Sequence, residues 1–305
     1  MSQVPPVQPL FDRALLAQRR RRARALGAAT FLIDRVAEDM AERLSAVRRT
    51  FDVAVDLGTP SGAVRRAILA GGAIGRLVAA MPDAAAPADE RTPMVVADEE
   101  RLPFRDASLD LVVSGLALQF VNDLPGALVQ IRRALRPDGL FLAALAGGDT
   151  LTELRQAFAA AEAEVEGGAS PRVAPFVDVR TMGALLQRAG FALPVTDIDR
   201  ASVRYDSPLA LMHDLRRMGA TNVLFERRSK GLRRDTLARL LDIYGERFAD
   251  ADGRVRASFD IIWLSGWAPH ESQQQPLRPG SARMRLADAL GTRELSAGER
   301  PNGDQ

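Results

Sequence analysis

The chain has 305 residues, which is enough for one large domain or two small ones with a sizeable buried core. Its formal charge of +2 is nearly balanced and 47% of its residues are hydrophobic, so the composition indicates a globular protein and does not favour nucleic-acid binding. The absence of cysteine excludes disulfides, thiolate-bound zinc, iron–sulfur clusters and a cysteine nucleophile. No apolar run is long enough to span a membrane, and we expect a cytoplasmic protein.

Residues 10–50 are expected to form an N-terminal helical extension behind a short tail. The tail, residues 1–9, contains three prolines without periodicity and is predicted to be disordered. The first helix carries six arginines between Arg13 and Arg24. This basic face either covers the sheet or makes a peripheral contact, with the inner membrane or with an acidic patch on a partner. The helical spacing of apolar residues covers 11–26 and 29–47.

Strand-like and helical segments alternate from residue 51 onward, which predicts a mostly parallel, doubly wound α/β sheet of Rossmann-like type. The helix that ends near Leu135 is expected to close in a turn, Arg136-Pro137-Asp138-Gly139, and residues 80–92 are expected to be a loop. The predicted strands cover 53–55, 75–80, 94–97, 109–114 and 140–145, and the helices between them cover 63–70 and 124–135.

Two further strands are predicted near the C-terminal end, and helices rather than a tight turn connect them. This arrangement leaves room for an inserted helical lid over 206–254 within a main domain over 51–291, followed by a disordered tail over 292–305. Thr150 is expected to cap the helix that follows the fifth strand, and Gly190 is expected to end the next helix. The later elements are predicted helices over 150–166, 179–189, 208–218 and 236–248 and strands over 193–205 and 257–267.

The most informative segment runs from Val53 to Gly62, where an apolar strand ends in Asp56 and a glycine-containing turn follows. Such a strand, turn and helix lets the backbone approach a nucleotide cofactor closely, although any α/β domain can contain a similar corner. A carboxylate at the turn suits a cationic ligand better than a pyrophosphate, which prefers bare N–H groups at a helix N-terminus. We therefore predict S-adenosylmethionine (AdoMet) rather than NAD. Pro60 occupies the place of the middle glycine in the D/E-x-G-x-G-x-G pattern of AdoMet sites.

A second cofactor segment, Asp98-Glu99-Glu100-Arg101-Leu102-Pro103-Phe104, follows the third predicted strand. Ligands of open α/β sheets bind beyond the carboxyl ends of the strands, so Asp98 could accept a hydrogen bond from an adenine amino group. Alignment places Met81 at the ribose-binding position after the second strand, with Asp83 two residues further on. The cofactor-binding candidates are Asp56, Gly58, Thr59, Gly62, Met81, Asp83, Asp98, Glu99 and Ser114.

Few polar side chains are available for catalysis. Gln119 and Asn122 follow the fourth predicted strand, where a substrate would meet the cofactor, although Asn122 could instead cap a helix. His213 lies inside a predicted helix and is expected to be structural, whereas His270 lies in a polar loop. An iron triad would need both histidines, from distant segments, so we expect no metal site. The catalytic candidates are Gln119, Asn122 and His270, and the substrate-binding candidates are Gln119, Phe120 and Trp267.

Several runs of sequence resemble known families. The run from Asp98 through Asp106-Ala107-Ser108-Leu109-Asp110-Leu111-Val112 resembles the class I AdoMet-dependent methyltransferase superfamily, of the methyltransferase type 11 kind. Residues 114–125, 147–155 and 266–274 are similar to bacterial relatives of the mitochondrial complex I assembly factors that act as arginine hydroxylases. A more distant resemblance is to the malonyl-carrier methyltransferases of biotin synthesis. Together these resemblances extend from Phe11 to about residue 289.

The resemblance implies an AdoMet-binding enzyme that modifies a protein arginine, on a respiratory complex I subunit close to the quinone. It allows either methyl transfer or hydroxylation of that arginine. One alternative is a non-catalytic assembly chaperone with a degenerate AdoMet site, for which Pro60 and Met81 are the support. Another is a methyltransferase for a small carboxylate or an acyl-carrier substrate, which would need an arginine in its pocket.

Overall fold

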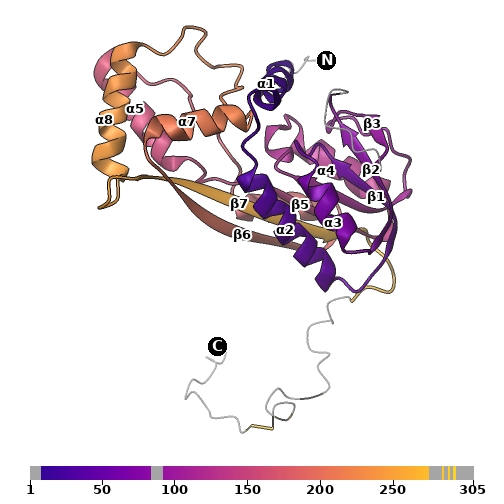
Figure 1. Cartoon of the computed structure of the whole chain (residues 1–305). Helices are drawn as coiled ribbons and strands as arrows, with labels where there is room; N and C mark the ends of the chain where they lie inside the picture. The colour runs from indigo at the N-terminus through magenta and orange to yellow at the C-terminus, as the bar shows by residue number, and fades with distance from the viewer. Residues whose placement is uncertain (1–7, 84–91, 275–283, 285–287, 289–290, 293–305) are drawn as a thin grey trace, which may run out of the picture. The chain divides into compact units, whose positions relative to one another are not determined.

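The structure is a computed structural model that describes residues 8–83, 92–274, 284, 288, 291 and 292 (Figure 1). The two predicted disordered tails lie almost wholly outside the described residues, as do residues 84–91 of the predicted loop. The chain divides after His270 into two compact units. The first unit contains all the helices and strands discussed below.

A seven-stranded sheet in the order β3-β2-β1-β4-β5-β7-β6 forms the centre of this unit. The first five strands in the chain run parallel, and the last two join the sheet in antiparallel pairs. The sequence therefore predicted the mostly parallel, Rossmann-like sheet correctly. The strands are β1 (Phe51–Leu57), β2 (Ile74–Met81), β3 (Met94–Val96), β4 (Leu109–Gly115), β5 (Leu135–Ala146), β6 (Ala192–Tyr205) and β7 (Val255–Trp267).

Helices cover both faces of the sheet, as a doubly wound fold requires. On one face α2 and α3 pack against β1, β4 and β5 around Met40, Val64 and Trp263. On the other face α4 and α6 pack around Leu128 and Met182. The helices are α1 (Arg13–Ala25), α2 (Phe31–Ala46), α3 (Ala63–Ala70), α4 (Leu124–Ala134), α5 (Thr152–Glu166), α6 (Val179–Arg188), α7 (Pro208–Arg217) and α8 (Arg234–Phe248), with a short 3-10 helix at Leu118–Phe120.

A third apolar core lies apart from the two sheet faces. Helices α5, α7 and α8 gather over one end of the long β6–β7 pair (Figure 1). Leu240, Ile243 and Tyr244 of α8 are fully buried there, against Tyr205 and the first residues of β7. Helices α7 and α8 connect β6 to β7, so they occupy the segment where the lid is predicted.

The strand order reverses direction at β1, which has β2 on one side and β4 on the other. Chain connections leave the carboxyl ends of β1 and β4 in opposite directions, and the crevice between them is the usual ligand site of such sheets. The fold alone therefore directs attention to the loops after β1, β2, β3 and β4.

Two local predictions are wrong. The turn predicted at 136–139 belongs to β5, which starts at Leu135 and pairs with Leu109 before a register shift. Asp138 accommodates the bend with a φ of +64°. Thr150 does not cap α5: Leu151 is the N-cap residue, and the Thr150 hydroxyl instead bonds to the Asp260 backbone at 3.1 Å.

Candidate cofactor and substrate site

The loop after β1 is built around Gly58, which has a φ of +72°. Only glycine adopts this conformation without strain, and a Cβ at this position would collide with the Glu99 carboxylate. The Gly58 N–H donates to the Ala80 carbonyl at 2.8 Å, and the Gly115 N–H donates to the Thr59 hydroxyl at 2.9 Å. These bonds fix the loop against β2 and β4, so its backbone faces the crevice in a defined position.

Asp56 does not face a ligand. Its side chain is completely buried, accepts a 2.8 Å bond from Arg65 and bonds to the Thr59 hydroxyl. Burial raises the pKa of Asp56 to about 6, against the opposing effects of Arg65 and Thr59. The expectation that this carboxylate meets a cationic cofactor is therefore corrected: Arg65, from the first turn of α3, already neutralises it.

A pocket lies beyond the carboxyl ends of β1, β2 and β3, with α1 as its roof. Five of the nine predicted cofactor residues line it: Gly58, Thr59, Met81, Asp83 and Asp98. The position and the strands that form it are those expected for a nucleotide-type ligand of an open α/β sheet.

The other four predicted residues support this pocket from outside its lining. The Ser114 hydroxyl donates to the Leu57 carbonyl at 2.8 Å, which ties β4 to β1. Gly62 is the N-cap residue of α3. Glu99 is 2% exposed and points toward Gly58, so its side chain, rather than its backbone, shapes the site.

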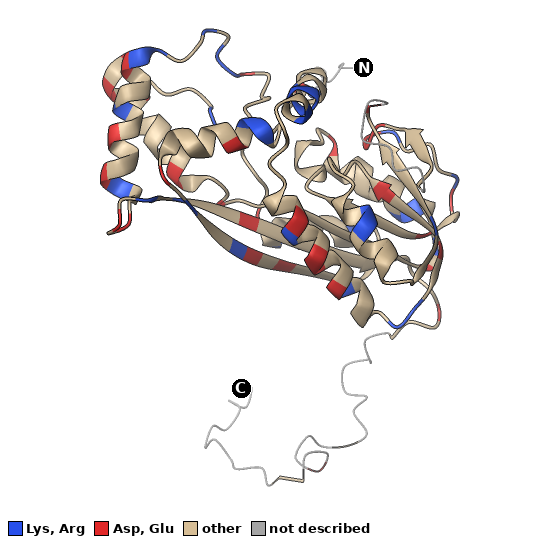
Figure 2. Ribbon diagram, in the orientation of Figure 1, with Lys and Arg blue, Asp and Glu red and all other residues tan. Residues whose placement is uncertain are grey.

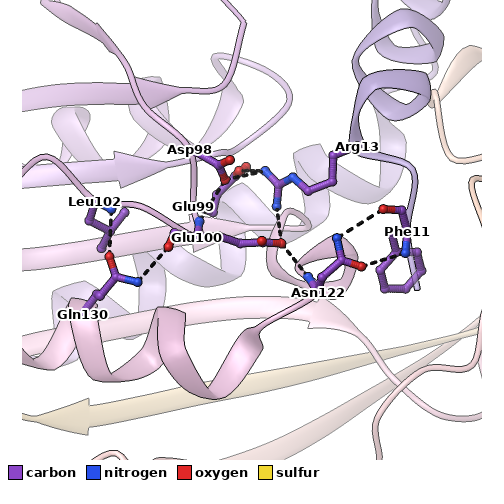
Figure 3. Close-up of polar contacts among 8 residues, drawn as sticks. All are labelled: Phe11, Arg13, Asp98, Glu99, Glu100, Leu102, Asn122 and Gln130. Carbon is purple, nitrogen blue, oxygen red and sulfur yellow. Dashed lines mark hydrogen bonds and ion pairs between the residues drawn. The ribbon is translucent and has the colours of Figure 1, made fainter. Parts of the chain in front are cut away.

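Arg13 fastens the start of α1 to the second predicted cofactor segment (Figure 3). Its guanidinium contacts three consecutive acids: Asp98 at 3.1 Å, Glu100 at 3.3 Å and the buried Glu99. Sequence reasoning did not find this contact, because nothing in the local pattern shows which acids an arginine of a distant helix will meet.

Asn122 also attaches the start of α1 to this acidic segment, because it bonds both to Phe11 and to Glu100. Its side-chain oxygen accepts from the Phe11 N–H at 2.7 Å and its amide donates to the Phe11 carbonyl at 3.2 Å (Figure 3). Its backbone N–H donates to Glu100 at 2.6 Å. These contacts show a positioning role for Asn122, and the predicted catalytic role is not supported by its place in the structure.

Ion pairs also hold the C-terminal half of α1 to the segment after β2. Asp83, the predicted ribose ligand, accepts bonds from Arg24 at 2.9 Å and from Arg21 at 3.1 Å. Arg19 bonds to Thr221 at 2.6 Å. Basic side chains are concentrated along α1 (Figure 2), and most of them meet groups of the protein itself, which is the alternative that the sequence left open. A membrane contact of this helix stays a prediction.

A second pocket adjoins the first. Arg20, Arg24 and Pro60 line both. Its other walls come from α2, β7, the segment after β4 and the end of α7. They are mainly apolar, with Leu32, Leu116, Phe120, Leu215, Phe259 and Ile261 among them. None of the described residues that line it is Asp or Glu.

Gln119 lines this second pocket and has a buried acceptor without a partner among the described residues. Its amide nitrogen donates to the Leu116 carbonyl at 2.9 Å, while its Oε1 is buried without a hydrogen-bond partner in the described structure. A buried polar atom without a partner is costly, and a ligand that brings a donor would satisfy it. Phe120 lies in the same wall, so both predicted substrate residues of this segment are at one place.

Trp267 and His270 line neither of these two pockets, and their predicted substrate-binding and catalytic roles stay predictions. Because β7 is antiparallel to β5, Trp267 pairs with Leu140, near the start of β5 and away from the carboxyl edge of the parallel strands. His270 lines a surface hollow with Arg49 and Asp138, also at that opposite edge.

His213 is exposed on α7 and is distant in sequence from His270, the other histidine. Within the part of the chain that the structure describes, no three metal-ligating side chains come together in a group that could hold an ion. Among those residues there is likewise no helix with the length and apolar character needed to cross a bilayer.

The fold and the pocket define a methyltransferase-fold protein. A family model described as a methyltransferase domain matches residues 55–143. The structure superposes on a candidate methyltransferase of Bacillus halodurans with a TM-score of 0.53 at 15% identity, over 76% of this chain and 99% of the other.

Relatives that match most of the chain, and not only the methyltransferase domain, show its family. The mitochondrial arginine-hydroxylase NDUFAF5 of Danio rerio is 38% identical over 92% of this chain and 89% of its own length. The human protein of the same name is 41% identical, over 85% of this chain and 76% of its own length. A malonyl-[acyl-carrier protein] O-methyltransferase of Xylella fastidiosa is 42% identical over 58% of this chain and 57% of its own length. The chain belongs to the family of the arginine-hydroxylase NDUFAF5.

Proposed function

We propose that this chain is an AdoMet-dependent enzyme that modifies an arginine side chain of a protein, on a subunit of respiratory complex I during its assembly. The observation that carries the proposal is the 38% identity to an arginine-hydroxylase over 92% of the chain. The likeness is therefore not confined to the cofactor-binding half. The sequence resemblance is the basis for proposing complex I as the target and a protein as the substrate.

The residues present fit AdoMet as the cofactor. Asp98 and the end of β3 would face the adenine, Asp83 the ribose, and the backbone of the Gly58 loop the centre of the molecule. Two features depart from the usual pattern: Pro60 replaces a glycine, and Asp56 is paired with Arg65. Neither closes the pocket, since Pro60 is part of its lining and the buried Asp56 and Arg65 lie outside that lining.

Bound in this pocket, AdoMet would supply an activated methyl group. The chain's own part is to orient the acceptor and to exclude water. The apolar walls of the second pocket exclude water, and the free Oε1 of Gln119 can accept a hydrogen bond from a donor N–H of the substrate. Gln119 is therefore our candidate for holding the acceptor group in place.

Calorimetric titration with AdoMet tests the cofactor part of this proposal. We expect saturable binding that weakens about tenfold or more in Asp98→Asn, because a hydrogen-bond acceptor for the ligand is weakened. Asp106→Asn is the control, since Asp106 is exposed and pairs only with Arg133 among the described residues. No binding by the wild-type chain would contradict the proposal and favour a non-catalytic assembly chaperone.

The substrate part is tested in cells that lack the gene. Mass spectrometry of purified complex I subunits should show an arginine that loses either one methyl group or one oxygen atom relative to the parent strain. Restoring the gene should restore the modification, and a Gln119→Leu copy should restore it only weakly. Unchanged arginines in the deletion strain would contradict the choice of substrate.

A second candidate is supported by the second pocket itself. A pocket for a guanidinium would be expected to contain a carboxylate, and none of the described lining residues is acidic. An apolar pocket with arginines at its wall suits an apolar chain that ends in a carboxylate. Methyl transfer to a small carboxylate or an acyl-carrier substrate is therefore the alternative, and an assay with such acids against an arginine-containing peptide distinguishes the two.

A further inference from the structure

The six arginines of α1 do not all have acidic partners: among the described residues Arg19, Arg20 and Arg22 form no ion pair, and of these three only Arg20 lines the two pockets. Arg13, Arg21 and Arg24 each form ion pairs. Arg20, on the same helix, forms no hydrogen bond or ion pair with any residue that the structure describes, and its guanidinium lies 5.9 Å from the centre of the Phe120 ring. A guanidinium carries five donors and stays charged in proteins, so an unpaired one inside a pocket is a site for an anion.

Arg20 lies where the two pockets meet. It lines both, together with Pro60 of the β1 loop. The strands run in the order β3, β2, β1, β4, so the first pocket covers the ends of the first three and the second pocket begins beyond β1. A ligand that occupied both pockets would lie beside this arginine.

The backbone of α1 is held closely at this point. Gly219, after α7, has a φ of +71°, and a Cβ there would lie 3.0 Å from the Arg20 Cα. The helix is therefore packed against the lid segment at the residue that carries the guanidinium. Such support limits the positions that the side chain can reach.

The electrostatic surroundings favour an anion beside Arg20. Burial lowers its pKa; Glu99 raises it, and the like charges of Arg13 and Arg24 lower it further. The cationic form is therefore poorly compensated by the protein itself. A carboxylate at this position would relieve the repulsion and form the paired hydrogen bonds for which a guanidinium is shaped.

We propose that Arg20 binds the amino-acid carboxylate of AdoMet at the junction of the two pockets. This inference rests on the proposed cofactor. With the adenosine over the ends of β3 and β2, the amino-acid arm would reach the β1 loop, where Arg20 and Pro60 line both pockets. The carboxylate is the anionic group of AdoMet. Asp56, already paired with Arg65, takes no part in holding this arm.

The test compares three ligands that differ at this arm. Calorimetry measures the affinity for AdoMet, for decarboxylated AdoMet, which lacks the carboxylate, and for 5′-methylthioadenosine, which lacks the whole arm. The variants are Arg20→Gln, Arg20→Lys and, as the matched control, Arg22→Gln, since Arg22 is exposed on the same helix and lines neither pocket. Thermal unfolding of each variant checks that it is folded.

We expect Arg20→Gln to weaken AdoMet binding roughly 10- to 100-fold, the usual effect of losing a charge-assisted bond. Its affinity for the two ligands without the carboxylate should stay within about twofold of the wild type, Arg20→Lys should be intermediate, and Arg22→Gln should be unchanged. The ratio of the affinities is the readout, because lost packing on Phe120 would weaken all three ligands equally.

Equal losses for all three ligands would overturn the inference and show a packing role. Unchanged AdoMet binding in Arg20→Gln would overturn it as well, because the carboxylate would then be held without this guanidinium. In both cases the cofactor proposal survives, because the wild-type chain still binds AdoMet. A wild-type chain that binds none of the three ligands would instead contradict the cofactor itself.

Discussion

The buried pair of Asp56 and Arg65 shows what a residue pattern can and cannot indicate. The sequence placed Asp56 correctly at the end of β1, beside the glycine turn. It gave no sign that Arg65, nine positions later in α3, would reach back to the carboxylate at 2.8 Å. The pattern of a strand, an acid and a glycine turn is local, whereas the neutralisation of the acid depends on how α3 packs. Asp56 is thus a structural group where a ligand contact was expected.

Replacing Arg65 by Met should destabilise the protein strongly. Breaking a buried ion pair from one side costs roughly 3–5 kcal/mol, because the remaining charge has no partner. Chemical denaturation of Arg65→Met against the wild type measures this loss. The double variant Asp56→Asn/Arg65→Met should recover much of it, since it leaves no buried charge. A single variant as stable as the wild type would contradict the role of the pair.

The same pair predicts a pH dependence. In the folded protein the pKa of Asp56 is raised from 3.8 to about 6, so the folded state holds this proton more tightly than the unfolded state. The contribution of Asp56 to the free energy of unfolding is therefore largest below its ordinary pKa and falls as pH rises toward about 6. In Arg65→Met the pKa should rise further, and the fall should extend to higher pH. Denaturation curves across that range, with Asp56→Asn as the flat control, measure the effect.

At the scale of elements, strand direction decided which predicted site residues come together. Alternating strands and helices gave the parallel strands β1 to β5, and with them the common edge where Gly58, Asp83 and Asp98 meet. The sequence of β7 is apolar and strand-like whichever way it runs. Its antiparallel direction carries Trp267 to the opposite edge of the sheet, and a single sequence contains no signal for that choice.

Helix α1 was predicted from the sequence, but the ion pairs that attach it to the rest of the protein were not. Arg13 is 18% exposed and holds the start of the helix to Asp98, Glu99 and Glu100. Arg24 holds the end of the helix to Asp83. Helix α1 therefore lies across the first pocket, because it lines that pocket and ion pairs attach it at both ends.

Replacing Arg13 by Gln should weaken the attachment of α1 to the rest of the protein. Three adjacent carboxylates would lose their shared cation, at a cost of roughly 1–3 kcal/mol, and their mutual repulsion would favour an open helix. Limited trypsin digestion should then cut within α1 several times faster than in the wild type. Arg22→Gln is the control for the number of charges and cleavage sites. Equal rates of cutting in both variants would show that α1 is held without Arg13.

Over the whole first unit, the packing falls into sheet cores and a separate helical core, which sequence periodicity could not distinguish. Leu128 of α4 and Leu240 of α8 are both fully buried leucines on amphipathic helices. Only the structure shows that Leu128 packs on the sheet and Leu240 packs among α5, α7 and α8. The second pocket uses both regions, since Leu116 follows β4 and Leu215 belongs to α7.

Separate cores should open separately, and the pair Leu128→Ala and Leu240→Ala tests this. Each truncation leaves a cavity and costs roughly 2–5 kcal/mol. Amide hydrogen exchange should speed up in α5, α7 and α8 in Leu240→Ala while the amides of β1 and β4 stay protected. Leu128→Ala should speed exchange in α4 and in the sheet strands, and also in α5, α7 and α8. Identical patterns in the two variants would show one cooperative core. If the helical core opens alone, the second pocket, whose wall includes Leu215 of α7, can open while β1, β2, β3 and α1 around the first pocket stay folded.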